Sequence, residues 1–422
     1  MIQKNLYVKS KIKYFPFAIH MKELILEKVS KQEYASMLFF LTLCGNVFCD
    51  TYMHSFIYVL TAIYFILLYL TKKNVKKRIS NNSRKSILQI ILCFLFLFFI
   101  QYLIFGWNTV PGIINHISKF IVGAGYIAYL GNKFRIIFFK TMYLICLIAL
   151  PLWIIQQLFG GIPGLNWALG KTIWIYCYRE GEDLIRNCGF FWEPGAFGGY
   201  IAFLTLLFFN DLSQLFKSNK WKCTVIIAAL LSTQSTGGYM SFGIIIMTYF
   251  AISMKSKAKY IILPLAIISA IYAYSNLTFL SDKFEEQNKS ASELEWGEYS
   301  STRMGTLMFD LYYIVKHPLV GNGLHEHTRL ADHLILAKML TNGDVAAAGN
   351  GFSDTIAKWG IIYAFVFALI FSRTNKKLPF SIKICFLLLV CLILQGEAFM
   401  NFPLFLGIPL IKLTINKFKS AQ

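Results

Sequence analysis

The sequence predicts an all-α integral membrane protein, a polytopic bundle of about 12 transmembrane helices with one large external loop. The first observation behind this prediction is composition: of 422 residues, 56% are hydrophobic and 15% are charged, and the mean hydropathy is +0.55. Soluble globular proteins contain roughly 45–50% apolar and about 25% charged residues. The composition therefore excludes a disordered chain and disfavours a soluble enzyme built from ordinary domains.

The second observation is a series of apolar segments near the length of about 20 residues that a helix needs to cross a bilayer. Some are strongly apolar, such as 86–106, whereas 35–49, 195–209, 223–236 and 402–415 are short or polar. The twelve predicted spans are residues 35–49, 54–71, 86–106, 112–130, 136–159, 195–209, 223–236, 237–254, 260–276, 352–372, 380–397 and 402–415.

The third observation is the arrangement of charge, which sums to +20 with 41 Lys+Arg against 21 Asp+Glu. With the N-terminus inside, the inner segments hold 30 basic and four acidic residues (+26), the outer segments hold nine basic and 16 acidic residues (−7), and Lys119, Lys358 and Asp354 within spans add +1. Cytoplasmic loops of membrane proteins carry such an excess of Lys and Arg. We therefore expect an inner-membrane protein with both termini in the cytoplasm, and no nucleic-acid partner.

The predicted spans divide the chain unevenly. The first 34 residues have no long apolar core before a cleavage site, so we expect them to remain as a basic segment along the inner membrane face. The largest loop leaves nine spans before it and three after it, and this disfavours a carrier built from two similar halves. The predicted parts are a cytoplasmic segment (1–34), helices 1–9 (35–276) with an external loop (160–194), a large external loop (277–351), helices 10–12 (352–415) and a cytoplasmic tail (416–422).

The large external loop predicts two amphipathic helices. A glycine-rich turn at 321–323 separates them, and Pro318 ends the first one. The second, over 325–340, has Leu330, Leu334 and Ala337 on its apolar side. The apolar face of the first helix, over 301–317, consists of Met304, Leu307, Met308, Leu311, Ile314 and Val315, at the spacing of a helix. The polar side of the second holds His325, Arg329, Asp332 and His333, which form either a solvated face or part of an anion site.

The smaller external loop ends in aromatic residues flanked by Arg186 and Glu193. Two interpretations stay open. Residues 190–192 are an interfacial belt and Glu193-Pro194 a helix start, or the two charges belong to a site at the mouth of a span. Cys177 and Cys188 share this loop and would be able to form a disulfide in an oxidising compartment, but their spacing does not establish one.

Charged residues inside predicted spans are functional candidates by default. Lys119 either binds a lipid phosphate or extends its ammonium group toward the membrane surface. Asp354 and Lys358 are one helical turn apart and are expected to pair with each other.

Three segments resemble the superfamily of O-antigen polymerases and O-antigen ligases, integral-membrane glycosyltransferases that use undecaprenyl-diphosphate-linked sugars. Their order, and a hydropathy profile with one large late external loop, extend the resemblance over nearly the whole chain. The resemblance implies a GT-C-like fold in the bacterial inner (cytoplasmic) membrane, with the active site on the periplasmic face. The three segments are Arg186-x-x-Gly189-Phe-x-x-Glu193-Pro-Gly195, Arg303 with His317-Pro-Leu-x-Gly321-x-Gly323, and Asn350-Gly-Phe-x-Asp354 with Trp359-Gly360-Ile-Ile-Tyr363.

Within this superfamily the residues favour a polymerase over a ligase. Ligases carry a His directly before the position of Asn350, where this chain has Gly349. An O-antigen ligase remains the alternative, and a lipid-linked oligosaccharide flippase is the alternative from another class. A flippase would be expected to line a central cavity with intramembrane charges, whereas this chain concentrates its polar residues in external loops.

The reaction implied by the resemblance transfers the growing glycan from its lipid diphosphate to the non-reducing end of a new lipid-linked repeat unit. Cations should meet the charge on the departing diphosphate, and a base or orienting group should meet the attacking hydroxyl. Arg186 and Arg303 are the candidates for the first task, and Glu193 and His325 for the second. The predicted substrate-binding residues are Arg329, Asp332, His317, Asn350 and Lys119. The expected partners are undecaprenyl-diphosphate-linked oligosaccharides, membrane lipids and a chain-length regulator protein, with no metal or other cofactor.

Overall fold

The structure is a computed structural model of the whole chain. Several predictions lie outside the residues that it describes: the segment 1–28, the span 260–276, the second loop helix with Arg329 and Asp332, and the C-terminal tail. The described residues are 29–46, 54–73, 75, 79–106, 110–159, 166–167, 171–172, 176–177, 186–253, 303–325, 350–376 and 378–411.

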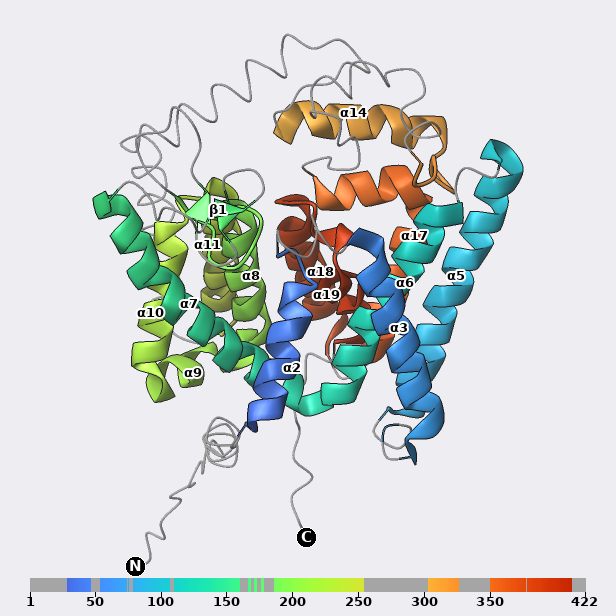
Figure 1. Cartoon of the computed structure of the whole chain (residues 1–422). Helices are drawn as coiled ribbons and strands as arrows, with labels where there is room; N and C mark the ends of the chain where they lie inside the picture. The colour runs from blue at the N-terminus through green and yellow to red at the C-terminus, as the bar shows by residue number, and fades with distance from the viewer. Residues whose placement is uncertain are drawn as a thin grey trace, which may run out of the picture.

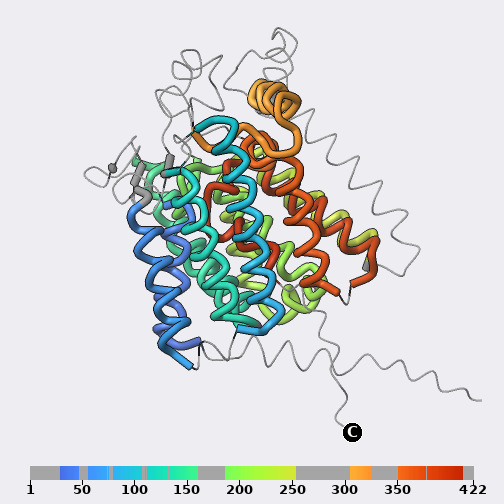
Figure 2. The backbone as a smooth tube through the Cα atoms, turned by 90° about the vertical axis from the view of Figure 1, so that its right-hand side faces the viewer, coloured from blue at the N-terminus to red at the C-terminus, as the bar shows by residue number. Residues whose placement is uncertain are grey.

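The described residues are mostly helical. Figure 1 shows helices that run between two ends of the molecule and one helix, α14, lying across one of these ends; the turned view of Figure 2 shows this orange helix end-on. The helices are α2 (Lys31–Thr42), α3 (His54–Thr71), α5 (Asn81–Phe105), α6 (Val110–Leu130), α7 (Phe134–Phe159), α8 (Pro194–Leu207), α9 (Leu212–Ser218), α10 (Lys220–Ser232), α11 (Thr236–Ser253), α14 (Arg303–Lys316), α17 (Gly351–Thr374), α18 (Phe380–Gln395) and α19 (Pro403–Leu406), with 3-10 turns η3 (Gly131–Lys133), η4 (Phe209–Asp211), η5 (Phe399–Asn401) and η6 (Ile408–Leu410).

Four described helices are long and apolar enough to cross a membrane: α5, α6, α7 and α17. α5, α6 and α7 confirm as long helices the predicted spans 86–106, 112–130 and 136–159, and α17 matches 352–372 in length but contains a break at Gly360. α8 passes the same test only together with η4 and α9, to which it is bent by 66°. α3, α11 and α18 are shorter apolar helices. The protein is therefore an all-α membrane protein, and the number of twelve spans stays a prediction.

The predicted spans 35–49 and 402–415 do not form single helices of membrane length, and α8 and α10, in place of 195–209 and 223–236, have only 14 and 13 residues. α2, in place of 35–49, has 12 residues and is about 18 Å long at 1.5 Å per residue, against a hydrocarbon core of about 30 Å. Pro403 begins α19, and Pro409 lacks the backbone N–H that would continue the helix, so the described part of 402–415 is divided between α19 and η6. Leu404, Phe405 and Leu406 are nonetheless completely buried, so this broken segment fills the interior of the bundle.

A small sheet that the sequence did not predict lies in the loop before α8. Its four strands of two residues pair antiparallel in the order β1-β2-β3-β4. Cys177 in β3 lies opposite Arg186 in β4, and its disulfide with Cys188 stays a prediction. The strands are β1 (Asn166–Trp167), β2 (Lys171–Thr172), β3 (Tyr176–Cys177) and β4 (Arg186–Asn187).

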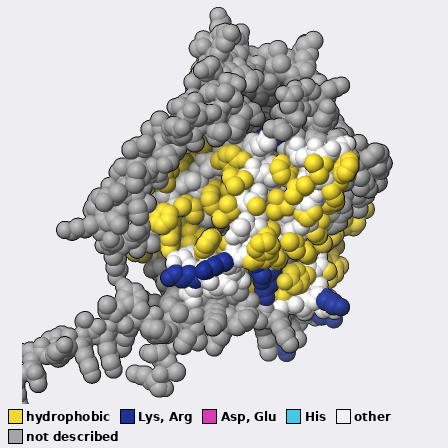
Figure 3. All heavy atoms as spheres, turned by 90° about the vertical axis from the view of Figure 1, so that its left-hand side faces the viewer, with side chains coloured by type: hydrophobic (Ala, Val, Ile, Leu, Met, Phe, Trp, Pro, Cys, Tyr) yellow, Lys and Arg dark blue, Asp and Glu magenta, His cyan; other side chains and the backbone are white. Residues whose placement is uncertain are grey.

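The sides of the bundle are apolar. α5 exposes Leu92, Phe96 and Leu103, and Figure 3 shows another side as a hydrophobic surface with basic side chains along its lower edge. Lys217 and Lys220, at the junction of α9 and α10, are both exposed. An apolar side bordered by Lys is the arrangement expected of a bundle embedded in a bilayer.

α8 lies in the centre of the molecule, and all its residues except Gly195 are buried. Its glycines allow neighbouring segments to approach closely. A Cβ added to Gly198 would lie 2.9 Å from the Cα of Gly238 in α11, and one added to Gly199 would overlap the ring of Phe399. The helix that follows the first resembling segment is therefore fixed on several sides.

Candidate active site

Arg186 is anchored at the end of α10. Its Nε donates to the carbonyl oxygen of Thr233 at 3.3 Å, and its Nη2 donates to that of Gln234 at 2.9 Å. Neutral carbonyls orient a guanidinium group without cancelling its charge. The ion pairs among the described residues are Lys133–Glu33, Arg135–Asp211 and Lys358–Asp354, so no described carboxylate neutralises Arg186.

The next residues connect Arg186 to α8. Asn187 is completely buried; its Nδ2 donates to Ser232 Oγ at 2.8 Å, and its Oδ1 accepts from the Gly189 N–H at 2.8 Å. Gly189 has a φ of +54°, and an added Cβ would lie 2.7 Å from the ring of Phe197. Both facts require glycine at this position of the resembling segment.

Glu193 is the N-cap residue of α8, and Pro194 follows at its first turn. This confirms the helix start that the sequence predicted. The Glu193 side chain does not cap the helix; its Oε1 accepts instead from Trp192 Nε1 at 3.0 Å. Phe190 and Phe191 are buried in the core, which excludes the interfacial belt for these two rings. The helix-start interpretation is thus correct, and it leaves the carboxylate at the mouth of the helix.

A second carboxylate at this helix end was missed by the sequence reasoning. Glu397 is only 5% exposed, and a Cβ added to Gly195 would overlap its Oε1. The Glu397 carboxylate therefore lies against the first turn of α8, two residues after Glu193. A signal existed in the sequence: Glu397 is the only acidic residue after Asp354, within an otherwise apolar region.

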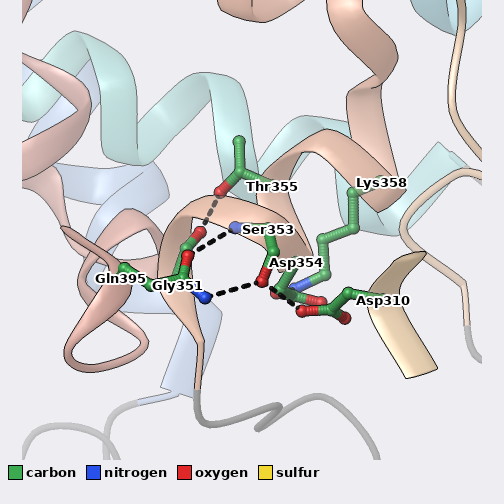
Figure 4. Close-up of polar contacts among 7 residues, drawn as sticks. All are labelled: Asp310, Gly351, Ser353, Asp354, Thr355, Lys358 and Gln395. Carbon is green, nitrogen blue, oxygen red and sulfur yellow. Dashed lines mark hydrogen bonds and ion pairs between the residues drawn. The ribbon is translucent and has the colours of Figure 1, made fainter. Parts of the chain in front are cut away.

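The segment 394–399 lies between the first turns of α8 and α17. Glu397 faces α8, and its backbone oxygen would overlap a Cβ on Gly351, the first residue of α17. On the α17 side, Gln395 Oε1 accepts from the Ser353 N–H at 3.0 Å and Gln395 Nε2 donates to Ser353 Oγ at 3.1 Å, as Figure 4 shows. This segment joins the beginnings of two helices that each carry a resembling segment.

Polar contacts also bind α14 to the first turns of α17. Ser353 Oγ donates to Asp310 Oδ2 at 2.5 Å (Figure 4), and Asn350 Nδ2 donates to Thr306 Oγ1 at 2.8 Å. Thr306, Asp310 and Asn350 are all buried. Asn350, predicted to bind substrate, thus has a structural contact that positions α14, on which Arg303 is the first residue.

Asp354 and Lys358 form the ion pair that the sequence predicted. Both side chains are buried, and they lie on the same helix as Ser353, next to Asp310 (Figure 4). A buried ion pair of this kind is costly to break, because either partner alone would be an uncompensated charge in the interior.

The second and third resembling segments form a single joint. α17 is interrupted at Gly360, with φ 75° and ψ 175°, and the turn after α14 packs into the interruption. The N–H groups of Asn322 and Gly323 donate to the carbonyls of Ala357 and Lys358 at 2.9 and 3.1 Å, and the Ile361 N–H donates to the Pro318 carbonyl at 2.8 Å. Backbone groups freed by the interruption are thereby paired, as buried groups must be.

Gln101 of α5 completes this joint. Its Nε2 donates to the carbonyl oxygens of Val320 and Lys358 at 2.6 and 2.8 Å. An added Cβ on Gly321 would overlap the backbone of Lys358, and one on Gly360 would overlap that of Leu319. Gly321 and Gly360, in the second and third resembling segments, are therefore explained by backbone packing.

The remaining predicted residues belong to α6, to α14 and to the turn after α14. Arg303 begins α14, and its side chain lies outside the description. His317 packs edge-on against Phe105 at 5.2 Å, and His325 is half-buried at the end of the described loop. Lys119, the tenth residue of α6, has its Nζ 4.7 Å from the ring centroid of Tyr58.

A protein-family comparison covers part of the chain. The model of a family described as WcaD colanic acid polymerase matches residues 127–292, which is less than half of the chain and includes Arg186, Glu193 and all of α8. No curated protein matches the chain. Over this part the protein is similar to a polymerase of polysaccharide biosynthesis, a glycosyltransferase-type enzyme, which supports the resemblance at the level of the superfamily.

Proposed function

We propose that the protein polymerises undecaprenyl-diphosphate-linked oligosaccharide repeat units in O-antigen, capsular or exopolysaccharide biosynthesis. The observation that carries this proposal is the meeting of the three resembling segments. The first segment leads into α8. The second and third segments form α14, the turn after it and the first turns of α17. Residues 394–399 contact the beginnings of both α8 and α17. The match to a colanic acid polymerase family supports the same conclusion.

The reaction needs positive charge for the departing diphosphate and a group that orients the attacking hydroxyl. Arg186 suits the first task because its guanidinium is oriented by two carbonyls and keeps its charge. We assign Arg303 to the same task, and Arg329 is the third candidate for it. Glu193 suits the second task, because its carboxylate is at the mouth of α8 and is not used as a cap. The remaining roles proposed from the sequence are those of His325 and Asp332 at the hydroxyl, of His317 and Asn350 at the sugars, and of Lys119 at a lipid phosphate.

The proposal includes a location and partners. The active site faces the periplasm, both termini lie in the cytoplasm, and the substrates are lipid-linked oligosaccharides supplied within the membrane. A chain-length regulator protein sets how often transfer repeats before release. No nucleic acid takes part.

The test is complementation of a strain that lacks the gene, read as the length distribution of its surface polysaccharide on a gel. The Arg186→Ala variant should give single repeat units in place of a ladder, with normal protein levels on an immunoblot. Arg186→Lys should give a weak ladder, since Lys keeps the charge but not the planar fork held by two carbonyls. Lys217→Ala, which removes an exposed base at the junction of α9 and α10, is the matched control and should leave the ladder unchanged.

Other outcomes would contradict the proposal. A full ladder with Arg186→Ala at normal protein level would remove Arg186 from the reaction. In the deletion strain, long lipid-linked polymer that is not attached to its acceptor would indicate a ligase. An accumulation of lipid-linked repeat units on the cytoplasmic side would indicate a flippase.

A further inference from the structure

Basic residues gather at one place on the end of the bundle opposite α14 (Figure 1). Seven lie within residues 72–85, around the end of α3 and the start of α5, and four lie within 373–383, where α17 ends and α18 begins. The stretches 51–179 and 355–396 contain no acidic residue. Elsewhere at this end, Glu33 and Asp211 pair with Lys133 and Arg135. The rule that Lys and Arg mark the cytoplasmic side accounts for the side of these bases, but it does not require them to gather without acids.

Side-chain contacts bring the three helix ends together. Arg84 of α5 has its Cζ 5.5 Å from the ring centroid of Tyr69 in α3. Arg373 of α17 donates from its Nη1 to Gln89 Oε1 of α5 at 3.4 Å, and Gln89 is one helical turn after Lys85 on the same face. The ends of α3, α5 and α17 therefore form one basic patch, which consists of Lys72, Lys73, Arg84, Lys85 and Arg373, all exposed except the half-buried Arg84.

An apolar stripe of α5 begins next to this basic patch. Leu88, Leu92, Leu95 and Phe99 are all exposed, and their spacing of three and four residues places them on one side of the helix. The basic residues 84 and 85 precede Leu88 by four and three residues, so they belong to the same side. The stripe is about 16 Å long at 1.5 Å per residue, which is about half of a hydrocarbon core of roughly 30 Å. This side of α5 therefore offers cations at one end and an apolar surface as deep as one leaflet.

We propose that the basic patch binds the headgroup of an anionic phospholipid such as phosphatidylglycerol, with an acyl chain along the apolar stripe of α5. The planar guanidinium groups of Arg84 and Arg373 match phosphate oxygens, and the three lysines add positive charge. Clusters of about four to eight Lys and Arg directly beside a membrane helix are typical of surfaces that bind anionic lipids. An acidic protein would match the charge but would leave the stripe to other lipids. The inference concerns a surface away from the candidate active site and does not rest on the proposed function.

Native mass spectrometry of the purified full-length protein tests this binding. The protein is mixed with phosphatidylglycerol and phosphatidylcholine that carry the same acyl chains, and the wild-type chain should retain the anionic lipid at least about fivefold more. Arg84→Gln with Arg373→Gln should bring the two lipids to near-equal retention. The matched control is Lys217→Gln with Lys220→Gln, which removes the same charge at the junction of α9 and α10, on the other side of the same end (Figure 1). This control should keep the preference.

Three outcomes would overturn the proposal. Equal retention of both lipids by the wild-type chain would mean that the bases serve topology alone. Equal loss of preference in the two double variants would indicate attraction by net charge without a site. Displacement of phosphatidylglycerol by the same concentration of free glycerol 3-phosphate would show that the apolar stripe takes no part.

A second variant keeps the test valid if the arginine variant has a lowered melting temperature. Lys72→Gln, Lys73→Gln and Lys85→Gln together change only exposed side chains of the basic patch, and surface substitutions of this kind rarely affect stability. This variant should lower the preference for phosphatidylglycerol at least about threefold. An unchanged preference would contradict the proposal.

Discussion

The arrangement of carboxylates at the start of α8 depends on Gly195, which has no side chain. Gly195 leaves space for the Glu397 carboxylate against the helix, so that two acidic groups from distant parts of the sequence lie at one helix end. The sequence identified Glu193 through its neighbours in the resembling segment. It contains no measure of the distance between residue 195 and residue 397, because their contact depends on how α8 and α18 pack.

Gly195→Ala tests the importance of this contact. The new methyl group would displace the buried Glu397 side chain, at a cost of about 1–3 kcal/mol for overpacking, and we expect a large loss of polymer with the protein still folded. Polymer length on a gel measures the loss of polymer, and the apparent melting temperature in detergent shows whether the protein is still folded. Gly237→Ala is the control, because an added Cβ there meets no atom within 4 Å; equal polymer from both variants would contradict a role for Glu397.

The buried pair of Asp354 and Lys358 makes a second prediction at this scale. Lys358→Met would leave Asp354 charged and uncompensated in the interior, and should destabilise the protein by roughly 3–5 kcal/mol. Replacing both residues, as Asp354→Leu with Lys358→Met, should cost less than either single change, because no buried charge is then left alone. Melting temperatures of the two single variants and the double variant check this, and additive losses would show that the two side chains do not act as a pair.

At the scale of elements, the interruption of α17 is a rigid joint. A break inside a transmembrane helix often marks a binding site where backbone groups are open to a substrate. Here the turn after α14 and the Gln101 side chain bind the freed groups. The motif residues Gly321, Gly323 and Gly360 therefore serve to seat α14 on α17, and through α14 to place Arg303.

Gly360→Ala should disrupt this joint. The position has a φ of +75°, and a Cβ would overlap the carbonyl of Leu319, so we expect a loss of roughly 2–4 kcal/mol from strain and overpacking combined. Gly243→Ala in α11 is the matched control, since it has open space and ordinary helical geometry and should be neutral or stabilising. The melting temperatures of the Gly360→Ala and Gly243→Ala variants measure these effects. An unchanged melting temperature for Gly360→Ala would show that the joint is loosely packed.

At the scale of the whole molecule, the helix ends that carry many of the basic residues lie at one end of the bundle and α14 lies at the other (Figure 1). The charge pattern alone predicts this separation, because topology is set by the side on which Lys and Arg gather. The orientation of the bundle in the membrane is expected from the same rule.

This orientation is testable with single cysteines at two exposed lysines. Lys316→Cys, on α14, should react with a membrane-impermeant maleimide in intact spheroplasts. Lys217→Cys, at the junction of α9 and α10, should react only after the membrane is permeabilised. Labelling of the wild-type chain gives the background of the native cysteines. The reverse pattern would place α14 in the cytoplasm and exclude a periplasmic active site.

The sequence by itself determined the class of the protein, its long apolar helices, a helix over 301–317 that is observed as Arg303–Lys316, and the pairing of Asp354 with Lys358, and it offered the helix start at Pro194 as one of two interpretations. These features depend on composition and on neighbours along the chain, which periodicity and charge report directly. Only the tertiary structure placed Glu397 against Gly195, divided residues 402–411 into short buried turns, and left Leu311 and Val315 of the predicted apolar face of α14 exposed. Each of these results depends on contacts between segments distant in sequence. In α14 the polar face is buried in place of the apolar one because its polar groups are hydrogen-bonded to α17, as buried polar groups must be.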